Sequence, residues 1–182
     1  DQEGGRVSRL DNFINVSNFT GKYFGKLYKK DIYKFRVHYE AFIKGNCYLL
    51  NDIGININTA PVLDIRYKKK HNIIGDRSFS SDHNIVSKIG NFAINTYHNN
   101  KIATVIKHIP GHGLATVDSH KSKPIVNKSL KYLKKKDFSS FKSKNSIFAM
   151  TAHILYSRID KKNTATHSKK IIDLIRNYIK FK

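Results

Sequence analysis

The sequence is poor in cysteine and in acidic side chains, and it contains no long apolar run. Its one cysteine, Cys47, cannot form an intramolecular disulfide, so nothing in the chain requires an oxidising compartment. Because Cys47 lies in an apolar helical pattern, we expect a buried, unreactive thiol. No apolar run approaches the roughly 18 residues of a membrane-spanning helix, so we expect a soluble globular domain without a membrane partner.

The scarcity of acidic residues leaves a basic chain, with 34 Lys and Arg against 13 Asp and Glu and a net charge of +21. Such an excess raises nucleic-acid binding as a candidate function. The lysines, however, are spread among many Asn and Ile residues, and the runs at 68–70 and 134–136 are short. A drift in composition toward Lys, Asn and Ile explains the charge as well as a binding face does. We therefore interpret the lysines as solvated faces and predict no nucleic-acid partner.

Segments with helical apolar spacing alternate with short runs rich in β-branched residues. The predicted order is α, β, α, β, α, β, α, with helices at 31–50, from 81 or 82 to at least 93, 129–141 and 168–179, and strands at 57–65, 102–106 and 146–154. Strands separated by helices favour a parallel sheet in an α/β fold. Because a closed eight-stranded barrel takes about 250 residues, we expect one domain that is a small open sheet or part of a barrel.

Polar, titratable side chains lie where the predicted strands end. Asp64 lies where the first strand runs into a loop, Lys107 and His108 follow the second strand, and His153 lies at the end of the third. In parallel α/β folds the catalytic groups gather at the carboxyl ends of the strands. The sequence therefore predicts a site at one face of the sheet, with His153 as a further candidate for its lining.

The densest group of such residues is "KHIPGHGLATVDSH", at 107–120. His108 and His112 are four residues apart, and His120 lies eight further on. Four-residue spacing places two metal ligands on one face only in a helix, but the proline and glycines between these histidines break helices. We therefore predict no metal site here. Pro110 and the glycines are expected to shape a loop that includes His112.

Five segments with distinctive residues follow one another along the chain: "DQEGGRVSRL" (1–10), "APVLDI" (60–65), "IGDRSFSSD" (74–82), "KHIPGHGLATVDSH" (107–120) and "AMTAHI" (149–154). Together they resemble the catalytic barrel of glycoside hydrolase family 3, and specifically that of the bacterial β-N-acetylhexosaminidases that recycle peptidoglycan. The resemblance covers nearly the whole chain. It implies that the α/β fold is part of a TIM-type (β/α)8 barrel.

The resemblance also implies a reaction, the two-step retaining hydrolysis of a β-linked N-acetylglucosamine through a covalent glycosyl-enzyme intermediate. It makes His120 the general acid/base and Asp118 its orienting partner. An imidazole has an ordinary pKa of about 6.5, so it can give and accept a proton near neutral pH, and a nearby carboxylate favours its charged form. From the residues alone, the alternative is that Asp118 and Ser119 cap a turn and His120 is exposed.

By the same resemblance, five side chains occupy positions that hold the terminal sugar: Asp1, Arg9, Arg77, Lys107 and His108. Charged donors and acceptors suit this task because they make strong, directional hydrogen bonds to hydroxyls. Simpler alternatives stay open, since Asp76 and Arg77 could form a structural ion pair and Arg9 could be a solvated charge. No cofactor is implied, because proton transfer and covalent capture need only side chains.

The sequence departs from the family pattern at the nucleophile. In the family this is an aspartate beyond a helix that resembles 168–181, whereas the sequence ends at Lys182. We therefore expect residues 1–182 to be an incomplete N-terminal barrel domain, inactive alone. The parent is expected to be a monomeric, cytoplasmic hexosaminidase that acts on N-acetylglucosamine-containing muropeptides. The alternatives are an inactive sugar-binding relative and a family 3 β-glucosidase, although "VDSH" argues against the glucosidase.

Overall fold

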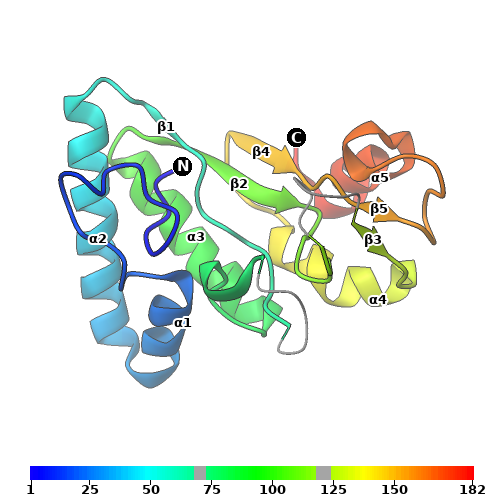
Figure 1. The fold of residues 1–182 in the computed structure, drawn as a ribbon, viewed down its shortest axis with the longest axis horizontal. Coiled ribbons are helices and arrows are strands. Elements are labelled where there is room, and N and C mark those ends of the chain that lie inside the picture. Colours follow the sequence, from blue (N-terminus) through cyan, green and yellow to red (C-terminus); the bar gives the residue numbers. More distant parts are fainter. Residues whose placement is uncertain (68–72, 118–123) are drawn as a thin grey trace.

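The computed structural model describes residues 1–67, 73–117 and 124–182, so Asp118 and His120 lie outside the described residues. Helices and parallel strands alternate along most of this chain (Figure 1). The elements are α1 (Gly21–Lys30), α2 (Ile32–Asp52), β1 (Ile57–Asn58), η1 (Gly75–Arg77), α3 (His83–Asn99), β2 (Ala103–Ile109), β3 (Ile125–Val126), α4 (Leu130–Lys135), η2 (Asp137–Phe141), β4 (Phe148–Thr151), β5 (Leu155–Tyr156), η3 (Ala165–His167), α5 (Lys169–Leu174) and η4 (Ile175–Ile179).

Two small parallel sheets form the centre of the fold. β1, β2 and β4 are hydrogen-bonded neighbours in that order, and β3 pairs with β5. In the first sheet, Ile57 pairs with Ala103 and Val105 with Phe148. Because these strands are parallel, their carboxyl ends lie at the same edge. The predicted parallel α/β fold is confirmed.

The helices α1, α2 and α3 supply much of the hydrophobic core. α1 packs on α2, and α2 packs on α3 (Figure 1). Phe24, Phe35 and Tyr39 are almost fully buried there, and the ring centroids of Phe24 and Tyr39 are 4.3 Å apart. Cys47 is buried in the same core, as predicted, and burial raises the pKa of its thiol to about 11. In the part of the chain that the structure describes, no helix is long and apolar enough to span a bilayer.

Side-chain caps fix the starts of the predicted helices, among them those of α3 and α5. The Asp82 carboxylate accepts a hydrogen bond from the Asn84 N–H at the start of α3. The Ser168 hydroxyl accepts one from the Ile171 N–H at the start of α5. Such caps satisfy N–H groups that have no partner within the helix. Both starts agree with the sequence prediction.

Other helix boundaries differ from the prediction. The sequence pattern does not predict α1, because this ten-residue segment contains two glycines, and packing on α2 stabilises it instead. The helix predicted at 129–141 is interrupted at Lys136, whose φ of −119° and ψ of −91° separate α4 from η2. The helix predicted at 168–179 is an α-helix only to Leu174 and continues as the π-helical turn η4.

The strands differ from the prediction mainly in length. The strand predicted at 57–65 forms a ladder only in β1, because Pro61 has no N–H to donate. It contacts β2 again further on, where the Leu63 N–H donates to the Lys107 carbonyl at 2.8 Å. β2 extends to Ile109, so Lys107 and His108 lie within the strand and do not follow it. The segment predicted as one strand at 146–154 contains β4, and β5 begins just after it.

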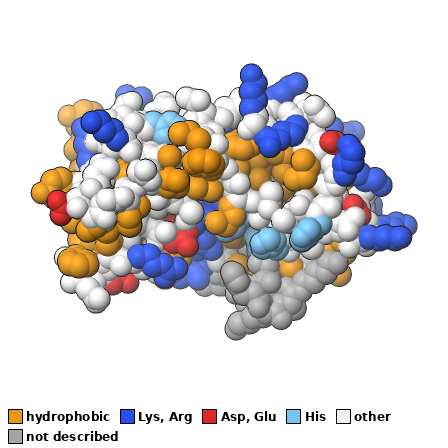
Figure 2. Space-filling view, turned by 90° about the horizontal axis from the view of Figure 1, so that it is seen from above, with side chains coloured by type: hydrophobic (Ala, Val, Ile, Leu, Met, Phe, Trp, Pro, Cys, Tyr) orange, Lys and Arg blue, Asp and Glu red, His pale blue; other side chains and the backbone are white. Residues whose placement is uncertain are grey.

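The surface charge is distributed in patches. Lysine and arginine side chains occupy several separate places on the face shown in Figure 2, with apolar and uncharged side chains between them. A nucleic-acid groove requires a continuous row of positive charge along the path of the phosphates.

Candidate active site

Four charged side chains meet where the amino-terminal segment lies against β2. Lys107 Nζ is 2.5 Å from Glu3 Oε1 and 2.6 Å from Asp1 Oδ1. Arg77, from η1, makes a bidentate ion pair with Glu3, with an Nη2–Oε1 distance of 2.8 Å and an Nε–Oε2 distance of 2.9 Å. We call these residues the charged cluster. Two acids and two bases alternate in it, so each charge has an opposite neighbour.

Burial and ion pairing act against each other in the charged cluster. The side chain of Lys107 is 2% exposed and that of Glu3 is 7% exposed. Burial lowers the pKa of Lys107, and the charge of Glu3 opposes this shift. Burial alone would raise the pKa of Glu3, but the hydrogen bond from Arg77 and the charge of Lys107 outweigh it and lower that pKa. Glu3 is therefore ionised at neutral pH and holds both bases in place.

A buried glutamine fixes the segment that carries both acids of the charged cluster. The Gln2 N–H donates to Asn58 Oδ1, and Asn58 Nδ2 donates to the Gln2 carbonyl, each at 2.9 Å. The Ser8 hydroxyl donates to Gln2 Oε1 at 3.1 Å. Because Gln2 is tied to the end of β1 in this way, the acidic residues on either side of it have defined positions beside β2.

A second pair lies next to the charged cluster. His108 Nδ1 is 2.7 Å from Asp64 Oδ2, and Asp64 Oδ1 accepts the His112 N–H at 2.6 Å. Asp64 is fully buried; burial would raise its pKa, but the charge and hydrogen bond of His108 and the His112 contacts lower it. Asp64 is thus a carboxylate that fixes the orientation of the His108 ring. Among the described residues, no hydrogen-bond partner is present for the Nε2 atom of that ring.

The structure brings together most of the residues predicted to bind the sugar. Asp1, Arg77 and Lys107 belong to the charged cluster, and His108 is the next residue along β2. Arg9 lies at the rim, 68% exposed, with Nη2 3.8 Å from Asp1 Oδ2. The candidate acid/base pair, Asp118 and His120, lies outside the described residues.

The alternative of an Asp76–Arg77 ion pair is wrong. Arg77 pairs with Glu3, and Asp76 pairs with Arg6, whose Nε is 3.0 Å from Asp76 Oδ1. Adjacent residues in a 3-10 turn point in different directions, so their proximity in sequence does not bring their side chains together.

Glu3 and Asp64 organise the site. Asp64 was predicted only as a polar residue at the end of the first strand, without a role, and Glu3 was not predicted as a site residue. Each lies in a motif that carries the family resemblance, Glu3 in "DQEGG" and Asp64 in "APVLDI". An acidic residue in an otherwise apolar or glycine-rich motif is a signal for a buried ion pair, because an unpaired buried carboxylate is costly. Such a signal marks a residue for burial and ion pairing, but the fold is needed to name its partners.

His153 lies at the same edge of the sheet as His108. The Ala152 N–H donates to the Ile109 carbonyl at 2.7 Å, which places the end of β4 beside the end of β2. His153 is exposed, and its Nδ1 is 2.8 Å from Thr166 Oγ1. Its position agrees with the prediction that it lines the same face. Within the described ranges, no group of three His, Cys, Asp or Glu side chains is arranged to hold a metal ion.

These observations define a class of protein, a parallel α/β barrel segment with a charged polar site at the carboxyl ends of its strands. The sequence profile described as "Glycosyl hydrolase family 3 N terminal domain" matches residues 1–182. The chain therefore belongs to glycoside hydrolase family 3, which confirms the resemblance drawn from the motifs.

Individual relatives agree with this assignment. The chain is 36% identical over 167 residues to "Beta-hexosaminidase A" of Pseudoalteromonas piscicida, which covers 88% of the chain and 27% of that protein. It is 31% identical over 186 residues to "Beta-hexosaminidase" of Actinobacillus succinogenes, which covers 100% of the chain and 52% of that protein. The chain thus spans about a quarter of the Pseudoalteromonas piscicida protein and about half of the Actinobacillus succinogenes protein.

Solved structures show the same fold. The crystal structure of NagZ from Neisseria gonorrhoeae in complex with N-trifluoroacetyl-D-glucosamine matches with a TM-score of 0.89 at 26% identity. The match covers 100% of the chain and 54% of that protein. A superposition of this quality over the whole chain confirms the partial barrel.

Proposed function

We propose that the complete protein hydrolyses terminal β-linked N-acetylglucosamine residues of peptidoglycan fragments by a two-step retaining mechanism. The substrates are muropeptides, and the enzyme acts in the cytoplasm as a monomer. The nucleophilic aspartate is assigned to the part of the family barrel that residues 1–182 do not cover, since the chain spans 52% of the Actinobacillus succinogenes relative, and residues 1–182 alone are inactive. The names of the relatives and the family assignment support the glycosidase class.

The charged cluster is the observation that carries this proposal. Asp1, Lys107 and Arg77 present fixed acceptors and donors within a few ångströms of one another, and Glu3 keeps them in position. A sugar ring has hydroxyls on adjacent carbons, and a fixed set of charged partners binds such a pattern with defined orientation. His108, oriented by Asp64, adds a further partner beside the charged cluster.

The proton transfers are assigned to His120. The nucleophilic carboxylate attacks the anomeric carbon while His120 donates a proton to the departing oxygen, and the C–O bond of the leaving group breaks. In the second step His120 takes a proton from water, which attacks the anomeric carbon and releases the carboxylate. Asp118 orients the imidazole and favours its charged form. These steps need no cofactor.

The test compares two chromogenic substrates on the full-length protein. p-Nitrophenyl N-acetyl-β-glucosaminide should be hydrolysed, and p-nitrophenyl β-glucoside should be hydrolysed at least about 100-fold less efficiently in kcat/KM, since the missing acetamido group removes transition-state contacts. The anomer released should be β. Preference for the glucoside would instead assign a β-glucosidase, and binding of N-acetylglucosamine without turnover would assign an inactive relative.

A further inference from the structure

A polar pair, formed by the buried Asp137 and the partly buried Tyr67, lies next to the loop that follows β2. The Tyr67 hydroxyl donates a hydrogen bond to Asp137 Oδ2 at 2.8 Å, which joins the segment after β1 to the start of η2. Asp137 is 1% exposed, and its other oxygen, Oδ1, has no hydrogen-bond partner within 1–67, 73–117 and 124–182. Neither residue belongs to the charged cluster. A buried carboxyl group with one unsatisfied oxygen is costly, so it calls for an explanation.

The loop at 110–115 passes in contact with this pair. A Cβ added to Gly111 would lie 2.7 Å from the Asp137 Cβ, so the Asp137 side chain lies directly against the loop backbone there. A Cβ added to Gly113 would lie 3.3 Å from the Tyr67 ring. The two residues of the pair therefore contact the loop at its two glycines, one on each side of His112.

Two more hydrogen bonds hold the same loop. The Tyr156 hydroxyl donates to the Gly111 carbonyl, and Asp64 accepts the His112 N–H. Asp64 also orients His108, so the position of the loop is linked to the position of a sugar-binding side chain. The backbone of the loop is thus fixed relative to β2.

Asp137 changes its charge near neutral pH. Burial raises the pKa of Asp137 to about 7, the hydrogen bond from Tyr67 opposes that shift, and the nearby Asp64 carboxylate adds to it. Lys136 favours the ionised form from the adjacent position, and the buried Tyr156 faces Asp137 from β5. Below neutral pH the group is a neutral acid beside the loop. Above neutral pH, Asp137 is ionised and adds a second negative charge near Asp64.

We propose that Asp137 and Tyr67 are positioning residues. They hold the backbone of the loop at 110–115 in place, and the proton-transfer motif follows this loop in the chain. The inference rests on the proposed function, because that motif begins at Asp118, three residues after Ala115 in the sequence. The pair acts through the loop backbone and not by contact with the sugar. Displacement of a catalytic group by 1 Å can cost about 10²-fold in rate, so a pair remote from the substrate affects turnover.

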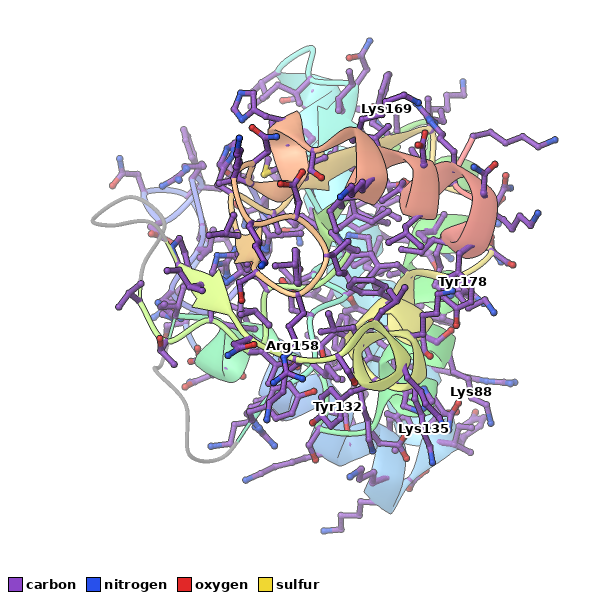
Figure 3. The ribbon with its side chains drawn as sticks, turned by 90° about the vertical axis from the view of Figure 1, so that its right-hand side faces the viewer. Lys88, Tyr132, Lys135, Arg158, Lys169 and Tyr178 are labelled. Carbon is purple, nitrogen blue, oxygen red and sulfur yellow. The ribbon has the colours of Figure 1, made fainter. Side chains whose placement is uncertain are left out.

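Kinetics of the full-length protein test this role. Tyr67→Phe and Asp137→Ala should each lower kcat for an aryl N-acetyl-β-glucosaminide about 10- to 100-fold, with KM changed less than about threefold because the charged cluster is intact. Tyr178→Phe is the matched control, since the Tyr178 hydroxyl donates to the Lys134 carbonyl at 3.2 Å where the C-terminal helical turn meets α4 (Figure 3). Equal kcat values for Tyr67→Phe and Tyr178→Phe would overturn the inference.

The conservative variant Asp137→Asn separates charge from packing. It keeps an oxygen for the Tyr67 hydroxyl and resembles the neutral acid, so its kcat at about pH 6 should be within about threefold of wild type. As pH rises to about 8.5, wild-type kcat should fall relative to that of Asp137→Asn, because only the wild type ionises beside Asp64. A ratio of the two kcat values that stays constant with pH contradicts the proposed role.

Hydrogen exchange of the loop gives a readout that does not depend on activity. The amides at 111–115 should exchange at least about tenfold faster in Tyr67→Phe than in wild type, and at the wild-type rate in Tyr178→Phe. Faster exchange in a protein without glycosidase activity would reject the proposed function and retain the loop-holding role. Unchanged exchange in Tyr67→Phe would reject the loop-holding role even if the enzyme is an active hexosaminidase.

Discussion

The Glu3 carboxylate and the Lys107 ammonium are 2.5 Å apart, and both side chains are almost completely buried. The same carboxylate binds Arg77 through both oxygens. Glu3 therefore compensates two buried or partly buried positive charges at once. Removing one partner of such an arrangement leaves a charge without compensation in a medium that solvates it poorly.

Replacement of Glu3 by glutamine should strongly destabilise the protein. Breaking a buried ion pair typically costs about 3–5 kcal/mol in the free energy of unfolding, and here Arg77 would lose its partner while Lys107 would keep only Asp1. The matched control is Glu40→Gln, since Glu40 makes an exposed pair with Lys44 on α2 at 2.7 Å. That exposed pair is expected to contribute less than about 0.5 kcal/mol. Urea denaturation of the full-length variants gives both values, and equal losses would contradict the role of Glu3.

The contribution of Glu3 should also depend on pH. The pKa of Glu3 is lowered from its ordinary value of 4.5 by Arg77 and Lys107, so its stabilising effect is fully present above that value. As pH falls through the lower, folded-state pKa, the carboxylate is protonated and the effect is lost. The difference in melting temperature between wild type and Glu3→Gln should therefore be large at about pH 7 and shrink at about pH 3. A difference that is the same at both pH values would show that the ion pairs do not stabilise the fold.

The Asp64–His108 pair should affect substrate binding. The Asp64 carboxylate accepts hydrogen bonds from the backbone N–H groups of His108 and His112 and from the His108 ring. Asp64→Asn replaces this carboxylate by an amide and so removes the charge that orients His108. KM for the aryl glycoside should rise about 10-fold, a typical effect of losing a partner that orients a binding group. Asp173→Asn, in an exposed pair with Lys169, is the control and should leave KM unchanged. An unchanged KM in Asp64→Asn would remove His108 from the sugar-binding set.

His120 carries the proposed proton transfers, so His120→Ala should lower kcat about 10²- to 10⁴-fold. The loss in kcat/KM should be smaller for a dinitrophenyl than for a methyl leaving group, because a good leaving group departs without protonation. Steady-state kinetics with the two substrates would reveal this difference. Equal losses for both, or near-normal activity, would reject His120 as the acid/base.

Much of the fold was accessible from sequence because its strands are β-branched runs separated by amphipathic helices. Local side-chain preferences predict the helix at 31–50 and the helix starts at Asp82 and Ser168. All three are present in the structure. α1 was not accessible in this way, because it depends on packing against α2 and not on its own propensity. The break at Lys136 directly precedes the buried Asp137, and no local pattern indicates either the break or the burial.

Only part of the candidate site could be predicted from the sequence. Motif resemblance identified Asp1, Arg77, Lys107 and His108, which the structure brings to one place. It did not identify Glu3, because the role of Glu3 is to pair with residues far away in sequence rather than to match a family function. Which buried charges compensate each other can be predicted only when the fold gives the distances between residues that are far apart in sequence.

Two glycines with opposite surroundings offer a test of the loop at 110–115. A Cβ on Gly113 would overlap the carbonyl oxygen of Ile65, whereas a Cβ on Gly45, within α2, would meet no atom within 4 Å. Gly45→Ala should therefore raise the free energy of unfolding by about 0.5–1 kcal/mol, since alanine loses less entropy in a helix. Gly113→Ala should lower it by about 1–3 kcal/mol, because the backbone must shift to admit the methyl group.

The backbone shift caused by Gly113→Ala should also lower the rate of catalysis. Because Gly113 lies in the loop that precedes the proton-transfer motif, Gly113→Ala should lower kcat about 10-fold or more, and Gly45→Ala should leave kcat unchanged. Denaturation and steady-state kinetics on the same two variants separate the effects. If Gly113→Ala lost stability but kept the wild-type kcat, the close approach to Ile65 would be a packing feature alone, and the loop would not set the position of the acid/base.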